Sequence, residues 1–302
     1  RFDVLFVQSQ PIFLSFTGQA LAFLKRRRYV LDVSDLWPDH LLTVGALTET
    51  HPVYRVARAL VNATFRGARH IVAMSPLWKS KIDGYIGQPD KTRVIYNGTD
   101  LTRFSPQVSG DAFRAQHGLA GVKVVSFIGA FTTQNDFDTL FEAARLLRHR
   151  ADIVFAFIGG GSLEHKQADA ADLPNVRWLG WVEADAMPQA WAASDITLMS
   201  LREHPLYEGI APAKYFEAMA CGVPIVAAAR GIPAQMLTDS GAGLAVPNGD
   251  AAGMAESITR LVDHADFYAQ CAQAGRAYAE AHFDPQRVTD AYEALLRDAV
   301  TP

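Results

Sequence analysis

The chain has 302 residues, of which 49% are hydrophobic and 20% charged, and its formal net charge is -4. This is the profile of a globular protein that is long enough for two domains with full-sized cores. The mild acidity argues against nucleic-acid binding, which needs a basic face. The two cysteines, Cys221 and Cys271, have no paired spacing and no Cys/His cluster around them. The sequence therefore predicts neither a disulfide framework nor a zinc site, and it favours a cytoplasmic location.

The start of the chain lacks the layout of a signal peptide, and no apolar run reaches the roughly 18 residues of a membrane-spanning helix. It opens directly on the strand-like run RFDVLFV. Helix and strand patterns alternate from there as if a domain were already under way. We therefore expect the first domain to lack its N-terminal part.

The first third of the chain predicts short apolar strands that alternate with amphipathic helices. Strands are expected at 4–7, 29–33, 70–74 and 92–96, and helices at 12–27, 53–66 and 76–85. The segment NGTDLTRFSP follows and combines Asn-Gly, Thr-Asp and Ser-Pro within ten residues. Such clustered turn chemistry indicates a linker between domains.

The alternation restarts after this linker. Strand-length runs are VKVVSFIGA, DIVFAFIGGG, NVRWLGW, DITLMSL, VPIVAAA and GLAVP, and the last 50 residues are helical apart from a break at HFDP. Buried strands separated by helices predict parallel sheets covered on both faces. We predict an α/β fold with two doubly wound, Rossmann-like domains at 1–104 and 105–282. Residues 283–302 are expected to form a helical tail that packs back on the first domain.

Ligands of such sheets bind beyond the carboxyl ends of the strands, where LYEGIAPAKYFEAMACGVPIVAAA (residues 206–229) lies. Pro212 suits the first position of a helix that ends near Cys221. The free N–H groups at this helix start, together with Lys214, favour an anion. Glu217 lies on the same face, about 4.5 Å further along the axis. A nucleotide diphosphate would use both charges, although an exposed i,i+3 ion pair is the alternative.

The segment EGIAPAKYFEAMACGVPIVAAA resembles the donor-binding signature of the GT-B-fold retaining glycosyltransferases of family 4. Further segments occur in the order of that family: VSDLWPDHLLTVGAL, VAMSPLWKSKI, VIYNGTDLTRFSP, FIGGGSLE, NVRWLGWV, ASDITLMSL and GAGLAVPNGD. The resemblance covers essentially the whole chain. It is greatest to bacterial enzymes that build cell-surface polysaccharides and carry DLWP.

The resemblance implies roles for individual residues. Glu217 corresponds to the glutamate that binds the donor ribose, and Lys214 to a lysine at the diphosphate. The loop Gly209, Ile210, Ala211 and Pro212 would turn its amides to the donor. Other implied donor-site positions are Gly129 and Phe131 after the first strand of the second domain, Gly160 after the next strand, and Trp181 and Val182 near the base. The implied hinge residues are Asn97, Gly98 and Asp100.

This chain departs from the family pattern at two places. The family often has two acidic residues that flank seven others, whereas Glu208 and Glu217 flank eight. Glu208 is therefore a displaced candidate for the second acid. Many members also carry an Arg and a Lys where this chain has Ala130 and Asn135. In this chain the negative charge of the donor phosphates would therefore be neutralised by Lys214 and backbone amides alone.

Three motifs have competing interpretations. Asp136 in DFD is expected to cap a helix rather than bind a metal. FIGGGSLEH lacks the third glycine of a dinucleotide site. The run KRRR at 25–28 ends a helix, and we expect Phe13, Phe16 and Phe23 before it to pack in the core. The alternative for these cations and aromatic rings is an anionic membrane surface.

Asp35 follows a strand, so its carboxylate is either a turn cap or a contact for the acceptor. Asp39 and His40 are weaker candidates.

Together these features predict a glycosyltransferase that moves a sugar, with retention, from a nucleotide diphosphate sugar to a glycan or polyprenyl-linked acceptor. No metal or other cofactor and no nucleic acid is expected, and the location is cytoplasmic or peripheral at the inner face of the plasma membrane. The alternatives are a nucleotide-sugar epimerase of the same fold and a non-catalytic nucleotide-sugar-binding remnant.

Overall fold

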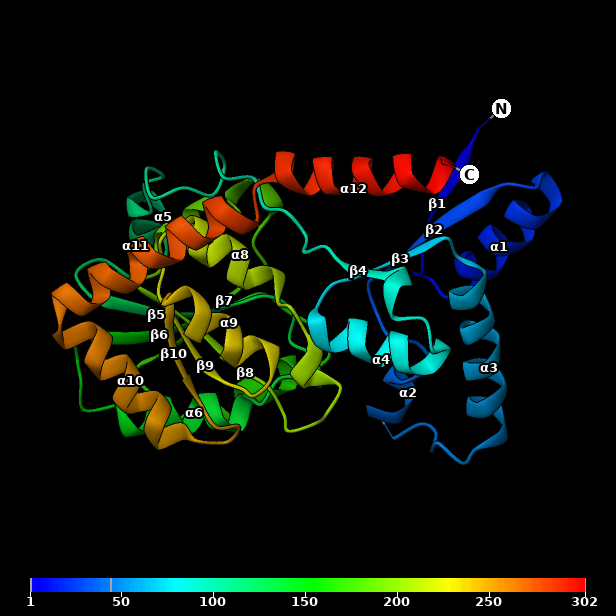
Figure 1. Ribbon diagram of the computed structural model, residues 1–302. Helices are drawn as coiled ribbons and strands as arrows, with labels where there is room; N and C mark the ends of the chain where they lie inside the picture. Colours follow the sequence, from blue (N-terminus) through cyan, green and yellow to red (C-terminus); the bar gives the residue numbers. More distant parts are fainter. Residues whose placement is uncertain (1, 44, 302) are drawn as a thin grey trace. The chain divides into compact units, whose positions relative to one another are not determined.

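The computed structural model describes residues 2–43 and 45–301, which form two compact units (Figure 1). Unit 1 runs from the start of the chain to Asn97 and also contains His204–Ala211 and the segment from Pro285 onward. Unit 2 comprises Gly98–Glu203 and Pro212–Asp284. Each unit contains one parallel β-sheet and its helices, so the predicted α/β fold with two parallel-sheet domains and a helical tail is confirmed.

The sheet of unit 1 has four strands in the order β1-β2-β3-β4. Its strands are β1 (Val4–Gln8), β2 (Arg28–Val33), β3 (His70–Ala73) and β4 (Thr92–Val94). Its helices are α1 (Phe13–Lys25), α2 (His40–Thr43), α3 (Pro52–Gly67), α4 (Pro76–Ile86) and α12 (Pro285–Val300), with short 3-10 turns η1 (Pro89–Lys91) and η4 (Tyr207–Gly209).

Alternate residues of these strands serve the two faces of the sheet. Leu31 and Ile71 pack in a cluster that also contains Phe65 of α3 and Ile82 of α4. The adjacent residue Val30 packs with Val72, Leu295 and Ala299, so α12 covers the opposite face. Helix α12 contacts β1 and β2, and Figure 1 shows its end beside β1.

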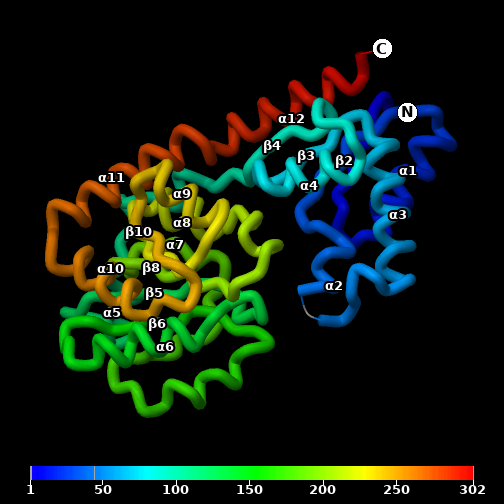
Figure 2. The backbone as a smooth tube through the Cα atoms, turned by 60° about the horizontal axis from the view of Figure 1, so that its bottom comes forward, coloured from blue at the N-terminus to red at the C-terminus, as the bar shows by residue number. Residues whose placement is uncertain are grey.

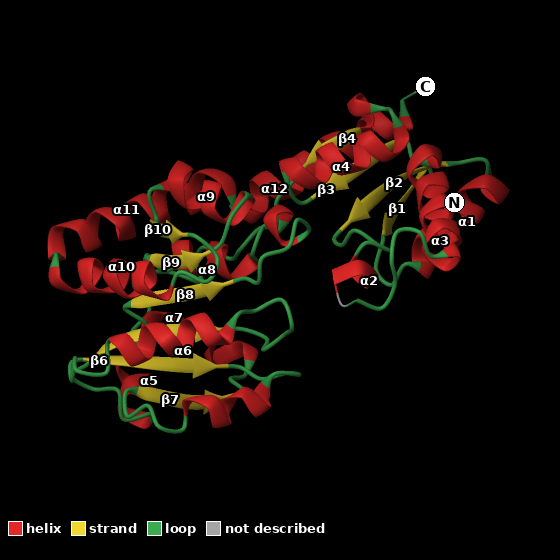
Figure 3. Ribbon diagram, turned by 90° about the horizontal axis from the view of Figure 1, so that it is seen from below, coloured by secondary structure: helices red, strands yellow, loops and turns green. Residues whose placement is uncertain are grey.

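The sheet of unit 2 has six strands in the order β10-β9-β8-β5-β6-β7 (Figure 3). Its strands are β5 (Lys123–Ile128), β6 (Ile153–Ile158), β7 (Val176–Gly180), β8 (Ile196–Ser200), β9 (Ile225–Ala228) and β10 (Gly243–Val246). Its helices are α5 (Asp111–Gln116), α6 (Phe137–Leu146), α7 (Met187–Ala192), α8 (Ala213–Ala220), α9 (Ile232–Ser240), α10 (Ala251–Asp263) and α11 (Ala265–His282), with 3-10 turns η2 (Glu164–Ala170) and η3 (Ala184–Ala186).

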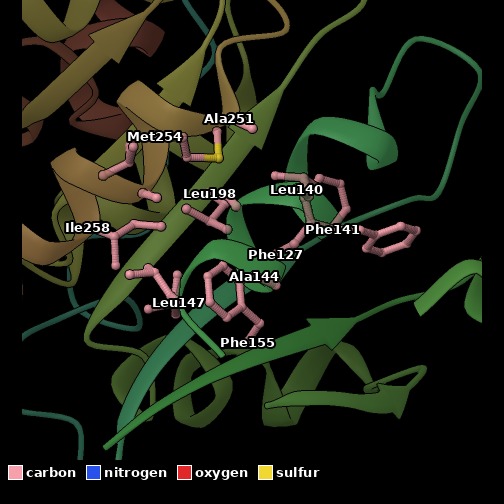
Figure 4. Packing of buried hydrophobic residues seen from close by; sticks show 14 of the residues in the cluster. Phe127, Leu140, Phe141, Ala144, Leu147, Phe155, Leu198, Ala251, Met254 and Ile258 are labelled. Atoms are coloured by element: carbon pink, nitrogen blue, oxygen red, sulfur yellow. The ribbon is translucent and has the colours of Figure 1, made fainter. Parts of the chain in front are cut away.

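The core of unit 2 lies between this sheet and helices α6 and α10. Figure 4 shows Leu140 and Leu147 of α6 close to Met254 and Ile258 of α10, over Phe155 and other strand side chains. Helices α10 and α11 contact each other, and α11 also contacts α8, as the tube in Figure 2 shows. Lys214 at the start of α8 lies near the carboxyl end of β5, since its Nζ is 4.1 Å from the centroid of the Phe127 ring.

Asp136 accepts a hydrogen bond from the Thr139 N–H at 3.3 Å and caps α6, as the sequence predicts. Pro212 is the N-cap of α8, with extended backbone, and not its first helical residue. The predicted strand at 92–96 is shortened to the three residues of β4.

The predicted domain boundaries need correction. The chain enters unit 2 at Gly98, before the expected boundary at 104 and 105, because Arg276 of α11 donates to the carbonyls of Leu101 and Phe104. It leaves unit 2 after Asp284, since Phe283 is buried and its ring lies 4.0 Å from that of Phe216. The segment 204–211, expected in the second domain, belongs to unit 1.

The expectation that the phenylalanines of α1 pack in the core is wrong for two of the three. Phe13 is 72% exposed and Phe23 is 82% exposed, whereas Phe16 is partly buried. Small residues take their place against the sheet, because α1 buries Ser15, Gly18 and Ala22. None of the helices in the described part of the chain is both long enough and apolar enough to cross a membrane.

Candidate functional site

The carboxyl ends of β5, β6 and β7 form a continuous edge in unit 2. Backbone hydrogen bonds join the loops there: Gly129 N–H donates to Ile158 O at 3.0 Å, and Gly159 N–H donates to Gly180 O at 2.8 Å. Phe131 N–H likewise donates to Gly160 O at 2.9 Å. The predicted donor-site glycines Gly129 and Gly160 therefore lie together on one rigid edge.

Glycine is required at this edge because backbones approach each other closely. A Cβ atom at Gly159 would lie 2.0 Å from the carbonyl oxygen of Gly129, and one at Gly161 would lie 2.7 Å from that of Phe131. Both residues also have strongly positive φ angles, which disfavour any side chain. The Gly-Gly-Gly run thus serves the tight packing of two strand ends and leaves their surface open to a ligand.

Lys214 lies at the first turn of α8 and reaches toward this edge. Its Nζ lies 4.1 Å from the centroid of the Phe127 ring, and a Cβ at Gly129 would be 3.4 Å from it. Among the described residues, no acidic side chain forms an ion pair with Lys214. Burial without an anionic partner lowers the pKa of Lys214 from 10.5 to about 8. A half-buried ammonium group beside free helix N–H groups is a ready site for an anion.

The carboxylate of Glu217 interacts with Trp191 and not with Lys214. Its Oε2 accepts a hydrogen bond of 2.8 Å from Nε1 of Trp191, a fully buried residue of α7. No ion pair joins Glu217 to Lys214 in the described structure, so the i,i+3 pair considered from the sequence does not form. Burial raises the pKa of Glu217, while the hydrogen bond from Trp191 and the charge of Arg103 lower it. Trp191 could not be predicted as a partner of Glu217, because the two residues lie 26 positions apart in the chain.

The other donor-side candidates in unit 2 have different surroundings. Phe131 is 1% exposed and packs against Phe127, Phe137 and Trp178. Its side chain is therefore part of the core, which corrects its place among the donor contacts. Trp181 follows β7 and is 73% exposed, and Val182 beside it is half-buried. An open indole beyond a strand end is available for stacking.

The two positions at which basic residues are missing also lie in unit 2. Asn135 is 2% exposed, and its Oδ1 accepts from the Thr132 N–H at 3.1 Å. Asn135 thus closes a turn, and its buried side chain is not accessible to a ligand. Ala130 is exposed.

The loop 204–211 is held in unit 1. Ser75 Oγ donates to the Gly209 carbonyl at 2.6 Å, and a Cβ at Gly209 would lie 2.4 Å from Nε1 of Trp78. The N–H groups of Gly209 and Ile210 donate to Leu206 and Tyr207 within η4. These two amides are consequently occupied, which corrects the prediction that they face the donor phosphates.

The remaining residues of this loop are less constrained. Glu208 lies in η4 and is half-buried, and Ala211 and Pro212 are buried. Pro212 belongs to unit 2, and it has no N–H group to offer. Of the four residues expected to turn amides to the donor, only Ala211 is left as a candidate donor of a hydrogen bond.

Asp35 lies in the loop after β2 of unit 1. Its Oδ1 is 3.0 Å from Nε2 of His40, whose ring makes an edge contact with Trp78. Both side chains of this pair are partly exposed. Asp39 has a structural role, because it is buried and accepts hydrogen bonds of 2.7 Å from Tyr54 and Tyr85 as well as one from Arg58.

The predicted hinge residues lie where the chain passes between units. Asn97 is the last residue of the first segment of unit 1, and Gly98 is the first of unit 2. Asp100 accepts hydrogen bonds from Thr102 and from the Arg103 N–H, and these bonds lower its pKa. Across the described part of the chain, no group of three or more His, Cys, Asp or Glu side chains could hold a metal ion.

Family models match most of this chain. Residues 122–264 match the model described as Glycosyl transferases group 1, and residues 1–98 match the Glycosyl transferase 4-like domain. Both matched parts of the chain are thus similar to glycosyltransferase domains. The boundary between the matches falls at the linker. The carboxyl ends of β5, β6 and β7, which together with Lys214 are called the donor edge below, lie within the group 1 match.

Curated relatives and solved structures agree with these matches. D-inositol 3-phosphate glycosyltransferase of Salinispora arenicola is 30% identical over 220 residues, which cover 66% of this chain and 48% of that protein. The probable glycosyltransferase WbjE of Pseudomonas aeruginosa is 24% identical over 269 residues, covering 87% of this chain and 67% of that protein. The chain thus spans from about half to two thirds of the length of these relatives.

The crystal structure of Anabaena HepE in complex with UDP has a TM-score of 0.80 to this chain, with 22% identity, and the match covers 98% of this chain and 79% of that one. Two further HepE structures contain UDP with glucose, or UDP-glucose. The chain therefore has the GT-B fold expected from the sequence.

Proposed function

We propose that the chain transfers a sugar, with retention of configuration, from a nucleotide diphosphate sugar to a glycan or polyprenyl-linked acceptor in the synthesis of a cell-surface polysaccharide. The observation that carries the proposal is the half-buried, unpaired Lys214 at the start of α8, facing the glycine edge of unit 2. UDP in the similar structure of HepE supports a nucleotide donor.

The chemistry follows from where the positive charge lies. Cleavage of the sugar–phosphate bond leaves negative charge on the departing diphosphate, and a fixed cation with helix N–H groups stabilises that charge as it develops. Lys214 supplies the cation from a half-buried position on a helix, so little reorganisation is needed as the negative charge develops. Protonated Lys214 is thus the residue that we assign to leaving-group stabilisation.

Glu217 is proposed to position the donor. Its Oε2 is held by Trp191, so the carboxylate is fixed in orientation and its other oxygen is available to the hydroxyls of a ribose. Trp181 is proposed to stack on the base, and Glu208 and Asp35 are proposed to contact the reacting sugar or the acceptor. Asn97, Gly98 and Asp100 are proposed as the hinge of domain closure.

A transfer assay tests this function. The chain is incubated with UDP-, GDP-, dTDP- and ADP-sugars and with polyprenyl-linked or oligosaccharide acceptors, and the anomeric configuration of the product is read by NMR. One donor should give a product with the configuration of the donor, and Lys214→Met should abolish its formation. Release or inversion of the sugar without any acceptor, or a product of inverted configuration, would contradict the proposal.

The matched control is Lys123→Met. Lys123 starts β5 at the opposite edge of the same sheet and is half exposed. Loss of its charge should leave transfer unchanged. Equal loss of activity in both lysine variants would mean that the net charge of the protein, and not the position of Lys214 at the donor edge, accounts for the effect.

A further inference from the structure

A recess lined by cations lies in unit 1. Its volume is about 430 Å³, which is within the range of cavities that bind small molecules. Four of the residues that line it are cationic, Arg27, Arg28, Arg69 and Lys91, and we call it the basic cavity. None of its other described lining residues carries a carboxylate. This positive charge is concentrated in a chain whose net charge is -4, so the basic cavity favours an anionic ligand.

The basic cavity lies where the parallel strands of unit 1 begin. Arg28 is the first residue of β2, Arg69 directly precedes β3, and Lys91 directly precedes β4. The candidate acceptor contact Asp35 follows the carboxyl end of β2 instead. The cavity and Asp35 are therefore at opposite edges of one sheet. A ligand in the cavity occupies neither the Asp35 edge nor the donor edge of unit 2, so the cavity is separate from the proposed transfer site.

The floor of the basic cavity is buried and held by hydrogen bonds. Tyr29 lines it and is 3% exposed. Its Oη donates to the Thr64 carbonyl, and Gln19 Nε2 donates to the Ala63 carbonyl at 3.1 Å, both near the end of α3. A Cβ atom at Gly67 would lie 2.7 Å from Gln19 Nε2 and 2.8 Å from Tyr29 Oη. Glycine at this position therefore leaves both polar groups uncovered, and a compact molecule can reach them.

The cations of the basic cavity have few anionic partners. Among the residues that the structure describes, the only ion pair of these cations joins Arg27 to Asp3 at 3.7 Å. Arg28 and Lys91 donate to backbone carbonyls of α12 and α3, which leaves further N–H donors on both side chains. Burial and, to a smaller extent, the charge of Arg69 lower the pKa of Lys91. The positive charges thus repel one another, and an anion would relieve that repulsion.

An exposed aromatic ring lies at the same cavity. Phe23, near the end of α1, lines the cavity and is 82% exposed. The next residue, Leu24, is 74% exposed but is not among the residues that line the cavity. A phenyl ring beside cations suits a nucleobase, because every base has a flat face that stacks on an aromatic ring. Inorganic phosphate would use the cations alone and leave the ring of Phe23 in water.

We propose that the basic cavity binds a nucleoside polyphosphate, a nucleotide with at least two phosphates in a row. The phosphate chain is bound by the four cations, and the base stacks on Phe23. The four cations and the neighbouring carboxylate of Asp3 leave a net charge of about +3, which a chain of two or three phosphates would balance. The inference goes beyond the proposed glycosyl transfer, because none of its residues belongs to the donor edge.

The proposal is tested by calorimetric titration of the full chain with ATP, GTP, AMP and inorganic triphosphate. Lys214→Met is titrated beside the wild type, since the proposed donor site is weakened in that variant and the basic cavity is intact. Lys214→Met should bind one ATP or one GTP per chain. It should bind inorganic triphosphate, which has no base, and AMP, which has no phosphate chain, about tenfold or more weakly. Raising the salt concentration should weaken ATP binding.

Two variants in the Lys214→Met background separate the parts of the site. Arg27→Glu with Arg69→Glu should weaken ATP binding about a hundredfold, because two attractive charges become repulsive. Phe23→Ser should weaken it about tenfold and reduce the preference for ATP over inorganic triphosphate. All three residues are exposed, so the thermal stability of each variant without ligand is expected to stay close to that of Lys214→Met.

The controls are matched to these variants. Leu24→Ser removes the exposed side chain next to Phe23 without changing the lining of the cavity. Arg148→Glu with Arg177→Glu makes the same change of charge at exposed positions of unit 2. Both control variants should bind ATP with unchanged affinity. Equal losses in Phe23→Ser and Leu24→Ser, or in the two pairs of arginine variants, would contradict the proposed site.

Failure of the donor site and failure of the basic cavity give different results. If Lys214 does not serve a donor, Lys214→Met binds every nucleotide like the wild type, and the Arg27 and Arg69 variant still loses ATP. ATP binding that Lys214→Met abolishes and this arginine variant leaves intact would instead confine nucleotides to the donor edge and overturn the inference.

Three further outcomes would also overturn it. Absence of ATP and GTP binding to Lys214→Met would leave the basic cavity without this ligand. Equal affinity for ATP and inorganic triphosphate would make the cavity a site for phosphate chains without a base. Displacement of ATP by phosphatidylglycerol vesicles at an equal phosphate concentration would assign the four cations to lipid headgroups.

Discussion

The donor edge of unit 2 and the basic cavity of unit 1 both favour anions, but they do so with different means. The donor edge uses one half-buried lysine, helix N–H groups and closely packed glycines. The cavity uses four cations beside an exposed aromatic ring. A single desolvated charge in a rigid setting favours one ligand geometry, whereas several solvated charges favour any chain of phosphates and respond to salt.

The largest effect is expected from changing the rigid backbone of the donor edge. Gly159→Ala would place Cβ 2.0 Å from the Gly129 carbonyl, and the φ of +134° is also unfavourable for alanine. We expect a loss of about 3 kcal/mol or more in unfolding free energy. Denaturant unfolding followed by circular dichroism measures this loss.

Gly180→Ala is the matched control for this experiment. Gly180 has a positive φ of +72°, but no atom lies within 4 Å of its added Cβ. Strain alone should cost about 1 kcal/mol. Equal losses in the two variants would mean that backbone strain, and not the contact between strand ends, makes glycine necessary at this edge.

Lys214→Met should separate stability from binding. The buried ammonium costs free energy in the folded state, so its removal is expected to stabilise the protein, by on the order of 2 kcal/mol. Nucleotide diphosphate binding should fall about a hundredfold in the same variant. The two effects are measured by thermal unfolding and calorimetry. A variant that is destabilised and still binds would show that Lys214 has a packing role.

The pH dependence of this stability difference follows from the lowered pKa. Below pH 8 Lys214 is protonated in both the folded and the unfolded state, and burying its charge destabilises the folded state in full. Between about 8 and 10.5 only the unfolded state keeps the proton, so the wild type gains stability relative to Lys214→Met as pH rises. Unfolding of both proteins across this range should therefore show converging stabilities. A constant difference would contradict the assigned pKa.

The affinity for the donor has its own pH dependence. An anion at Lys214 favours the charged form, so binding above pH 8 must be accompanied by uptake of a proton. The affinity should fall by up to about tenfold per pH unit above 8. Calorimetry in buffers of different ionisation enthalpy measures the proton uptake directly, and Lys214→Met should show none.

The smallest effect is expected from Trp191→Phe. Phenylalanine keeps most of the buried ring but removes the Nε1 donor to Glu217. The hydrogen bond is worth about 1 kcal/mol to folding. Because the carboxylate loses its orientation, KM for the donor should rise severalfold with little change in kcat. An unchanged KM would show that Trp191 does not position Glu217.

The sequence was sufficient for the features that depend on local pattern. Short apolar runs alternating with helices predicted two parallel-sheet domains, and Asp136 before an apolar-periodic segment predicted an N-cap. Glycines after β5 and β6 were also correctly placed at the carboxyl ends of strands. Such features follow from periodicity and backbone preferences, which each stretch of sequence carries by itself.

Features that depend on distant partners could not be predicted in this way. The loop 204–211 follows a strand of unit 2, yet Ser75 and Trp78 hold it in unit 1. Phe13 and Phe23 are apolar residues in a helix and were expected in the core, but small residues of α1 take that position. Hydrophobicity predicts that such a side chain avoids water, and it does not predict what covers it.

The most direct test of the donor site is calorimetric titration of the wild type, Lys214→Met and Lys123→Met with UDP, GDP, dTDP and ADP at pH 7. One diphosphate should bind to the wild type and to Lys123→Met with equal affinity, and its affinity for Lys214→Met should be about a hundredfold lower. Absence of binding to every diphosphate, or equal binding to all three proteins, would contradict the assignment of Lys214 to the donor diphosphate.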